Sequence, residues 1–600
     1  MDPDELLTLP ENLEKQERLG ILGHPYIKSS NITEKMRAIT IDWIFSVVKM
    51  FKMGVGTAFA TINIFDAYLS RYEKISKHHI QLVGLASLSL AAKYNEIYHP
   101  DVKDYVFVVS NMYTAGEIRE TEHNIFITLG CNINVPRDIE YLKTISQISG
   151  LSEIIYEICK NLMLSIAINI DNLTYLPSVI ATAVISMVTK LYETNYVNIF
   201  KVPNDLVNIC SNTVIENCKK LKRSSLQAYK KLGAKGYVRN EWLNVFNLIC
   251  ELEVNEETNK DTSKDTNKEV NKKVNKKVSK ETNKDISKVT NKDYSYYTRV
   301  KYFKPDISMN LIPAAQIPKS SRKLGEGTFG IVKQITYNGK QYAVKKMRKF
   351  DDDTTTTSFL REVSIMLSLD HPNIAKVEYI SDNLGSIFFT LGVSDLKNWI
   401  VNKDRNNNLQ IELATQMFSA LSYIHYEGCL HRDIKPANII VYDNPLRFVL
   451  SDFGSARGSQ IALKNNLFTQ NICTLPYRSI ELLLGKPDYG PELDVWSMLC
   501  TIYEFATEDI LFFGYSEVDQ MIKIFRVLGT PSDNTWPGVT QFTHYKRIYL
   551  QVPVFVPQKA YFSNNRELSE CYKELLNKGL IMNPDYRPSS HELLAIVNEY

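Results

Sequence analysis

The 600-residue sequence lacks paired cysteines, long apolar runs and a large excess of either charge. Its nine cysteines are scattered without a C-x-x-C pair, which argues against a disulfide framework and against a zinc site. The most apolar stretch, residues 162–188, is interrupted by Asp171, Asn172 and Pro177 and so falls short of the ~20 unbroken residues of a membrane span. No basic segment followed by an apolar run opens the sequence. These absences predict a nuclear or cytoplasmic protein without a membrane partner.

The net charge of +3 is too small to indicate a nucleic-acid partner. Apolar residues make up 44% of the chain and charged residues 23%, as in ordinary globular proteins. At ~150 residues per domain, the length suggests about four compact units.

Residues 251–294 have almost nothing apolar to bury, because they repeat a four-residue pattern of Asn or Ser, Lys, an acidic residue or Lys, and Thr or Val. A helix here would stack lysines at i and i+4 and would contain many poor helix formers. We therefore expect a disordered linker with an r.m.s. span of roughly 35 Å, and its simplest role is that of a passive spacer.

The two flanking regions differ in their hydrophobic periodicity. Before the linker, Ile39, Trp43 and Val47 share one helical face and residues 82–92 are apolar nearly all round, as in a buried helix. After it, residues 330–344 alternate in the manner of two strands around an Asn-Gly turn, and the chain from residue 409 is mainly helical. We expect an all-α region, then a small β-rich lobe followed by a larger helical lobe.

The C-terminal region carries the motifs of phosphoryl transfer. His-Arg-Asp-Ile-Lys-Pro-Ala-Asn spans residues 431–438 and Asp-Phe-Gly spans 452–454. The G-x-G-x-x-G of residues 325–330 alone is weak, since dinucleotide-binding folds share it, but here it lies within a hairpin and Ala-Val-Lys follows at 343–345. The Lys345 ammonium needs a carboxylate partner, which Glu362 can supply from a helical run downstream.

These motifs predict a role for each side chain. Asp433 would accept or orient the proton of the substrate hydroxyl, and Lys435 would neutralise the migrating phosphoryl group. Asn438 and Asp452 would coordinate Mg²⁺. Lys435 is similar to the lysine of serine/threonine kinases, so serine or threonine is the expected acceptor.

From residue 318 to 600 the sequence resembles the cyclin-dependent kinases. The resemblance rests on six segments: residues 325–330, 358–362, 474–478, 494–497, 516–520 and 528–531. It implies an α+β bilobal kinase fold with an N-lobe at 318–392 and a C-lobe at 393–600. In this family three arginines close over one phosphothreonine, which implies a cluster of Arg361, Arg432 and Arg457 around phosphorylated Thr469 and an activating kinase for that residue.

Phe329 replaces the inhibitory tyrosine usual in the family, which implies loss of control by tyrosine phosphorylation. The hinge would begin after Phe389 and has a glycine at 392 in place of a bulkier residue, and Glu481 is expected to pair with Arg587. A preference for proline after the acceptor is also implied. The residues expected at the nucleotide are Leu324, Gly325, Glu326, Gly327, Thr328, Phe329, Gly330, Val332, Ala343, Lys345, Phe389, Thr390, Gly392 and Asp395.

The N-terminal region resembles the A/B-type cyclins. The resemblance rests on Met-Arg-Ala-Ile at 36–39, Asp-Trp at 42–43 and the segments 80–84 and 91–98. It implies two five-helix repeats, at residues 36–135 and 136–240, after an N-terminal segment of residues 1–35. Lys93 and Glu122 match the residues with which cyclins grip the kinase. Lys93 lies in an otherwise apolar helix, where an unpaired ammonium would be costly, so we expect it to have a partner.

The substrate-docking patch of the cyclins maps to Met36, Ile39, Trp43, Ile80 and Gln81. Ser46 stands where a glutamate usually receives the arginine of a docking peptide, which implies weaker selectivity for arginine.

Together these features predict an ATP- and Mg²⁺-dependent protein kinase that carries its own cyclin and drives cell-cycle progression. The cyclin and kinase would pair within one chain or between copies. Alternatives are a transcription-type kinase acting on the RNA polymerase tail, a non-catalytic scaffold and a nucleic-acid-associated factor. Residues 219–223 are basic and could act in nuclear import, although a basic helix face is the simpler interpretation.

Overall fold

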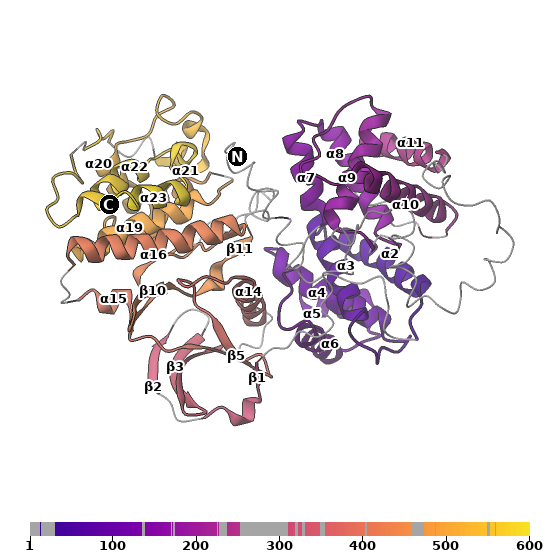
Figure 1. Cartoon of the computed structure of the whole chain (residues 1–600), viewed down its shortest axis with the longest axis horizontal. Coiled ribbons are helices and arrows are strands. Elements are labelled where there is room, and N and C mark those ends of the chain that lie inside the picture. The colour runs from indigo at the N-terminus through magenta and orange to yellow at the C-terminus, as the bar shows by residue number, and fades with distance from the viewer. Residues whose placement is uncertain are drawn as a thin grey trace. The chain divides into compact units, whose positions relative to one another are not determined.

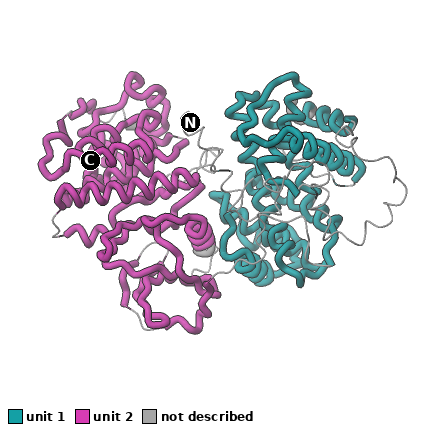
Figure 2. Tube along the Cα trace, in the orientation of Figure 1, with its two compact units in different colours: residues 1, 3–307 teal, residues 2, 308–600 magenta. Residues whose placement is uncertain are grey.

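The computed structural model describes residues 13, 31–134, 138–169, 171, 174–224, 226, 237–252, 310–318, 322–326, 330–347, 354–401, 405–458, 473–486, 488–548, 553–558 and 560–600. These residues divide into two compact units, with the boundary between Ile307 and Ser308 (Figure 2). The predicted linker, apart from Glu251 and Leu252, lies outside the described residues. No helix in the described ranges is both long and apolar enough to span a bilayer.

The N-terminal unit is all-α, as its periodicity predicted (Figure 1). The first five described helices are α2 (Glu34–Met50), α3 (Val55–Leu69), α4 (Ile80–Asn95), α5 (Val102–Val108) and α6 (Ala115–Thr128). The next five are α7 (Asp138–Ile148), α8 (Glu153–Ile166), α9 (Pro177–Leu191), α10 (Asn204–Lys222) and α11 (Tyr237–Glu251). Helix α4 is buried along nearly its whole length among α2, α3 and α6, and α9 occupies the same position among α7, α8 and α10. Each repeat thus has one buried central helix.

Arg37 links the two repeats. Its guanidinium forms a bidentate pair with Asp66 of α3, with both N–O distances at 2.7 Å, and donates to the carbonyl oxygens of Ala167 and Ile168 just beyond α8. Both side chains are buried, so the charge is balanced inside the fold. The second repeat also extends further than residue 240, where the sequence placed its end, because α11 continues to Glu251.

The C-terminal unit begins with a six-stranded sheet. Its strands, in sheet order, are β1 (Leu311–Ile312), β5 (Val377–Ser381), β6 (Ser386–Thr390), β4 (Lys340–Met347), β3 (Gly330–Tyr337) and β2 (Arg322–Glu326). The predicted hairpin is β3–β4, and it turns at Asn338 and Gly339, whose φ angles are 48° and 75°. Strand β1 pairs in parallel with β5, so the unit starts before residue 318, the boundary expected from the sequence.

The rest of the unit is mainly helical. Helix α14 (Thr354–Ser368) packs on the sheet beside β5. Beyond it come α15 (Leu396–Trp399), α16 (Asn407–Tyr426), α18 (Ile480–Leu484), α19 (Glu492–Thr507), α20 (Glu517–Leu528), α21 (Thr543–Ile548), α22 (Glu570–Gly579) and α23 (Ser590–Val597). Short strands β7 (Ser394–Asp395), β8 (Cys429–Leu430), β9 (Ile439–Asp443), β10 (Leu446–Leu450) and β11 (Arg457–Gly458) frame the loops between the lobes. The fully buried α19 is the core helix of this lobe.

Candidate active site

The ammonium of Lys345 lies between two carboxylates. From β4 it donates to both oxygens of Glu362 on α14, at 2.7 and 2.8 Å, and to Oδ1 of Asp452 at 2.7 Å. Glu362 is fully buried and Lys345 nearly so. The strand, the helix and the loop after β10 therefore meet at one cation, which is the pairing that the sequence predicted for Lys345 and Glu362.

Burial and charge act in opposite directions at this cluster. Burial disfavours the charged form of Lys345, but the carboxylates of Glu362 and Asp452 outweigh it and raise the pKa of the ammonium. Burial raises the pKa of Glu362, and the attraction of Lys345 offsets only part of that effect. For Asp452, burial is outweighed by Lys345, so its pKa is lowered. Asp452 is thus held as an anion, the form that binds cations.

The side chain of Asp433 is surrounded by hydrogen-bond donors. Its Oδ2 accepts from Lys435 Nζ at 2.7 Å and from Asn438 Nδ2 at 3.2 Å. Its Oδ1 accepts from the Thr474 hydroxyl at 2.8 Å and from the Thr474 amide at 3.1 Å. Lys435 also donates to the same threonine hydroxyl at 2.8 Å. The carboxylate is therefore fixed in direction, as an acceptor that must meet a substrate hydroxyl should be.

The backbone of this loop is fixed by Asp494 at the start of α19. The buried carboxylate of Asp494 accepts from the amides of His431 and Arg432, both at 2.7 Å. Arg432 has a φ of 66°, a strained value for a residue with a side chain. Its guanidinium donates to the Ser455 carbonyl and to the Tyr489 hydroxyl. Asp494 thus stabilises the bent loop that presents Asp433.

Asn438 and Asp452 could hold a divalent cation. The Asn438 amide nitrogen donates to the Asp433 carbonyl at 2.7 Å, so the amide oxygen is the group that can bind a metal. Asp452 has a φ of 61°, and the buried Phe453 after it packs edge-on against His431 at 4.8 Å. One carboxylate and one amide oxygen suit Mg²⁺, which usually takes its remaining ligands from phosphates and water. Within the described residues, no cluster of three His, Cys, Asp or Glu side chains could hold a metal alone.

The hinge after Phe389 lies close to β9. A Cβ atom on Gly392 would stand 2.3 Å from Cγ2 of Ile440, so only glycine fits there. Nearby, the Tyr442 hydroxyl donates to the Thr390 carbonyl at 2.9 Å, and the Arg447 guanidinium lies over the Tyr442 ring. The glycine that departs from the family pattern is thus explained by the packing of β9 against the hinge.

The structure describes most of the other residues that the sequence predicted at the nucleotide. Leu324, Gly325 and Glu326 lie on β2, and Val332 pairs with Lys345 across β3 and β4. Ala343 pairs with Phe389 across β4 and β6. Gly330 begins β3 where a Cβ would meet the Lys346 carbonyl at 2.4 Å. Gly327, Thr328 and Phe329 lie outside the described residues. Asp395 caps α15 by accepting from the Asn398 amide at 2.8 Å, an additional role that the sequence did not indicate.

Of the predicted arginine cluster, Arg361 lies on α14, Arg432 in the loop before Asp433, and Arg457 on β11. Strand β11 pairs with β8, which leads directly into that loop. Thr469 lies outside the described residues, so its place beside these arginines stays a prediction.

Beyond Asp433, the segment 473–478 is held in an unusual conformation. Cys473 has a φ of 65°, and its carbonyl accepts from Nη2 of Arg478 at 3.1 Å. Nη1 of Arg478 also donates to Glu517 of α20 at 2.6 Å. Further on, Arg587 and Glu481 form a fully buried bidentate pair, at 2.9 and 3.1 Å, as the sequence predicted. This pair fixes α18 against the helical lobe.

In the N-terminal unit, Lys93 Nζ donates to Oε2 of Glu122 at 2.8 Å. The two side chains are 3% and 6% exposed. The ammonium expected to need a partner therefore has one on α6 of its own unit, and its burial alone does not require the kinase. Oε1 of Glu122 is buried and has no hydrogen-bond partner among the described residues.

The residues of the predicted docking patch come from α2 and α4, which pack together. Ile39 is 50% exposed, Met36, Trp43 and Gln81 are half-buried, and Ile80 is buried. Four of these five residues thus keep exposed surface, and Ile80 is the buried one.

Sequence reasoning assigned no role to Thr474, Arg478, Asp494 or Tyr442. The first three lie in segments that carried the family resemblance, so a position-by-position comparison could have singled them out. Tyr442 lies in a strand whose apolar sequence predicts only burial. Nothing in the sequence indicates the hydrogen bond from its hydroxyl to the hinge.

Comparison with known proteins agrees with both units. Residues 319–597 match the family model of the protein kinase domain, and residues 8–134 match that of the cyclin N-terminal domain. The chain is similar to "Cyclin-dependent kinase 2" of Caenorhabditis elegans, with 37% identity over 246 residues. That alignment covers 39% of this chain and 66% of the relative, just under two thirds of its length.

Proposed function

We propose that the chain is a cyclin-dependent serine/threonine kinase carrying its own cyclin, because residues 319–597 match the protein kinase domain and residues 8–134 match the cyclin N-terminal domain. The observation that carries the proposal is the joint geometry of Lys345, Glu362, Asp452 and Asp433, in which each charged group has the partner that phosphoryl transfer requires. A non-catalytic scaffold has no need of this arrangement.

When bound, ATP with Mg²⁺ supplies the phosphoryl group that is transferred. Lys345 would hold the phosphates, and Asn438 and Asp452 would hold the cation. Asp433 would accept the hydroxyl proton of a serine or threonine while Lys435, 2.7 Å away, balances the charge that develops on the migrating group. The serine/threonine preference rests on Lys435, which resembles the lysine of that kinase class.

The geometry of Cys473 favours proline after the phosphoacceptor. Its left-handed backbone turns the carbonyl toward Arg478, which occupies that acceptor. A substrate residue lying beside this carbonyl would find no free acceptor for its amide N–H, and an unpaired buried N–H costs ~1–3 kcal/mol. Proline has no N–H and escapes this cost.

A peptide-library phosphorylation profile on the full chain tests the substrate class. We expect phosphate on serine and threonine before proline, and no transfer by Asp433→Asn. Arg478→Ala should free the Cys473 carbonyl and reduce the preference for proline by about tenfold, which corresponds to ~1.4 kcal/mol. A profile dominated by tyrosine, or an unchanged proline preference in Arg478→Ala, contradicts the proposal.

We further propose that the cyclin region contacts the helix α14 that carries Glu362, in cis or between copies. The unpartnered Oε1 of Glu122 supports this contact, because a buried acceptor without a donor is costly. A tether raises the effective concentration of the two partners to about millimolar, enough to saturate a micromolar interface. The cyclin would then never limit the activity.

Cleavage within the linker tests the coupling. A protease site inserted in residues 259–293 of the full chain would separate the units after folding. Cleavage should abolish activity when the protein is diluted to nanomolar concentration and spare it at micromolar concentration. If dilution of the cleaved protein leaves the activity unchanged, the kinase does not depend on its cyclin. A cell-cycle role and a nuclear or cytoplasmic location remain part of the proposal, and a transcription-type kinase would instead prefer polymerase-tail peptides in the same profile.

A further inference from the structure

The segment Asn310–Ile317 precedes the kinase family match, which begins at residue 319, yet it is built into the kinase sheet. The Asn310 carbonyl accepts from the Ile380 amide at 3.1 Å, and the Ile312 carbonyl accepts from the Asp382 amide at 2.9 Å. After Pro313 the chain turns into a short 3₁₀ helix, and the Ala314 amide donates to the Asp382 carboxylate at 2.8 Å. The chain leaving the linker is thus fixed along the outer edge of β5.

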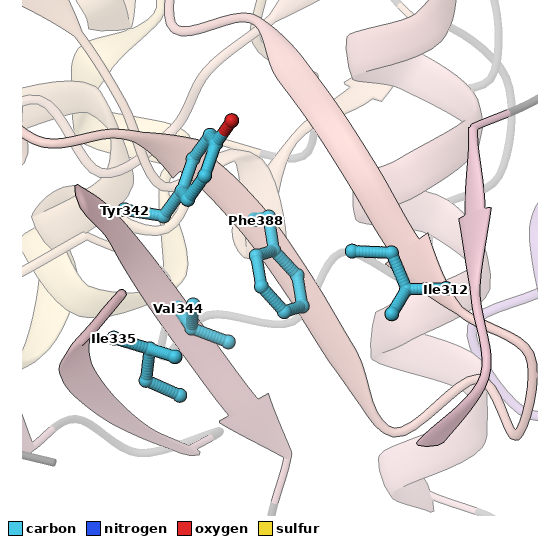
Figure 3. Packing of buried hydrophobic residues seen from close by; sticks show 5 residues of the cluster. All are labelled: Ile312, Ile335, Tyr342, Val344 and Phe388. Carbon is cyan, nitrogen blue, oxygen red and sulfur yellow. The ribbon is translucent and has the colours of Figure 1, made fainter. Parts of the chain in front are cut away.

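Ile312 is the one fully buried residue of this segment. It is 1% exposed and belongs to one apolar cluster with Ile335, Tyr342, Val344 and Phe388. Figure 3 shows the Ile312 side chain directed toward the Phe388 ring, with Val344 on the far side of that ring. Leu311, the neighbour of Ile312, is only half-buried and lies on the other face of the strand. Ile312 therefore makes the apolar contact of β1, and the partly buried Ile317 of the same segment packs against the same cluster.

The cluster lies directly behind the nucleotide residues. Val344 precedes Lys345 on β4, and Phe388 precedes Phe389 on β6, so in each strand one side chain enters the cluster and the next faces the opposite side of the sheet. Strand β5, to which β1 is bonded, also packs against α14, the helix that carries Glu362. A shift of β1 would therefore change the positions of both Lys345 and Glu362.

We propose that Asn310–Ile317 is a positioning segment, and that Ile312 is a positioning residue that sets Lys345 for nucleotide binding. The inference rests on the proposed kinase function and adds to it a part that the kinase family match does not include. The chain that follows the linker thus forms part of the kinase sheet. It is attached along β5, the strand that packs against α14.

Variants of the full chain test this role. Ile312→Ser removes the apolar contact, Leu311→Ser is the matched control on the other face of the same strand, and Ile312→Val is the conservative rescue. For Ile312→Ser we expect amide exchange at Ile380 and Asp382 to be at least about tenfold faster, and the KM for ATP to rise about fivefold with the peptide KM unchanged. The other two variants should stay within about twofold of the natural protein in all three measurements.

Any of three outcomes overturns the proposal. Ile312→Ser could loosen both amides without changing the KM for ATP, which would make the segment a structural support only, or Leu311→Ser could act as strongly as Ile312→Ser. If Ile312→Ser does not fold, Asp382→Ala removes the acceptor of the exposed Ala314 amide and should raise the KM for ATP by about twofold; faster exchange without that rise also overturns the proposal. Absence of phosphate transfer by the natural protein would contradict the kinase function instead, and calorimetric ATP binding would still report on Ile312.

Discussion

Two buried lysine–glutamate pairs, one in each unit, have the same chemistry but different surroundings. In the kinase unit, Lys345 bonds both oxygens of Glu362 and also Asp452. In the cyclin unit, Lys93 bonds one oxygen of Glu122 and leaves the other without a described partner. In the first pair both oxygens of Glu362 have a donor within the unit. The second carboxylate at Lys345, that of Asp452, indicates a site for cations. The second pair leaves a buried acceptor without a described hydrogen bond, the feature from which we propose a contact with the kinase unit.

Burial of an ion pair therefore does not by itself identify its role. A buried pair is costly to break, because removal of one member leaves an uncompensated charge. The two pairs differ in their further contacts: Lys345 also donates to Asp452, whereas Glu122 keeps one oxygen without a partner in the described residues. Variants of each pair separate the catalytic role of the first from the interface role proposed for the second.

Breaking the catalytic pair should have the largest effect. In Lys345→Met the ATP phosphates lose their cation, and phosphate transfer should fall by about 10²–10³. Lys346→Met, at the adjacent half-buried lysine, should keep its activity within about threefold. Both variants are compared by initial rates of phosphate transfer and by thermal melting. Equal losses in the two variants would show that the effect is not specific to the pair.

Breaking the cyclin pair should first reduce stability. Lys93→Met leaves the Glu122 carboxylate buried without its cation, which should lower the free energy of unfolding of the N-terminal unit by ~3–5 kcal/mol. Denaturant unfolding followed by Trp fluorescence measures this change.

The double variant Lys93→Met with Glu122→Leu then separates stability from contact. An apolar replacement of the whole pair should restore most of the stability. The activity of the full chain should nevertheless stay low if Glu122 bonds the kinase. Recovery of both stability and activity would rule out a role for Glu122 at the interface.

Acidification should affect the catalytic pair at a pH above the usual range of a glutamate. Burial raises the pKa of Glu362, and only its ionised form can hold Lys345. As the pH falls through this raised pKa, kcat/KM for ATP should drop about tenfold per pH unit. Folding stability should change in the opposite direction. A carboxyl group whose pKa is raised by folding contributes more stability at low pH than at high pH. In Glu362→Gln the acidic limb of the pH–rate profile should be absent.

Shortening each glutamate by one methylene should give the smallest effects. Glu362→Asp cannot reach Lys345 with both oxygens, and we expect about a tenfold loss in kcat/KM for ATP, or ~1.4 kcal/mol. Glu122→Asp should lower the stability of the N-terminal unit by ~1 kcal/mol and leave the KM for ATP unchanged. If Glu122→Asp instead raises the KM for ATP as strongly as Glu362→Asp, the two pairs do not have separate roles.

Much of this fold follows from local sequence signals. The apolar periodicity of the first half predicts helices, the Asn338-Gly339 turn predicts the β3–β4 hairpin, and the motif around Asp433 indicates the reaction class. These features depend on residues close together in the chain, which is why a single sequence contains them. The pairing of Lys345 with Glu362 was also predictable, because the motifs specify both residues and the reaction needs them adjacent.

Features that depend on distant packing were not predictable. Nothing local distinguishes Leu311 and Ile312 from a linker end, because a two-residue strand forms only when the edge of β5 is available. The fit of Gly392 against Ile440 and the partner of Lys93 depend on helices and strands that come together only in the fold. The second repeat was expected to end at residue 240, but α11 continues to Glu251, because its sequence runs into the polar segment without a glycine or proline to stop it.

The parallel strand β1 has one more consequence, which concerns solubility. An uncovered strand edge presents unpaired amides and carbonyls to any other extended chain and promotes aggregation. Here the outer edge of β5 is covered by a strand of only two residues, and Pro313 directly after it cannot donate to a further strand. During synthesis the segment that protects this edge emerges from the ribosome before the sheet that needs it, so β5 is covered as soon as it folds.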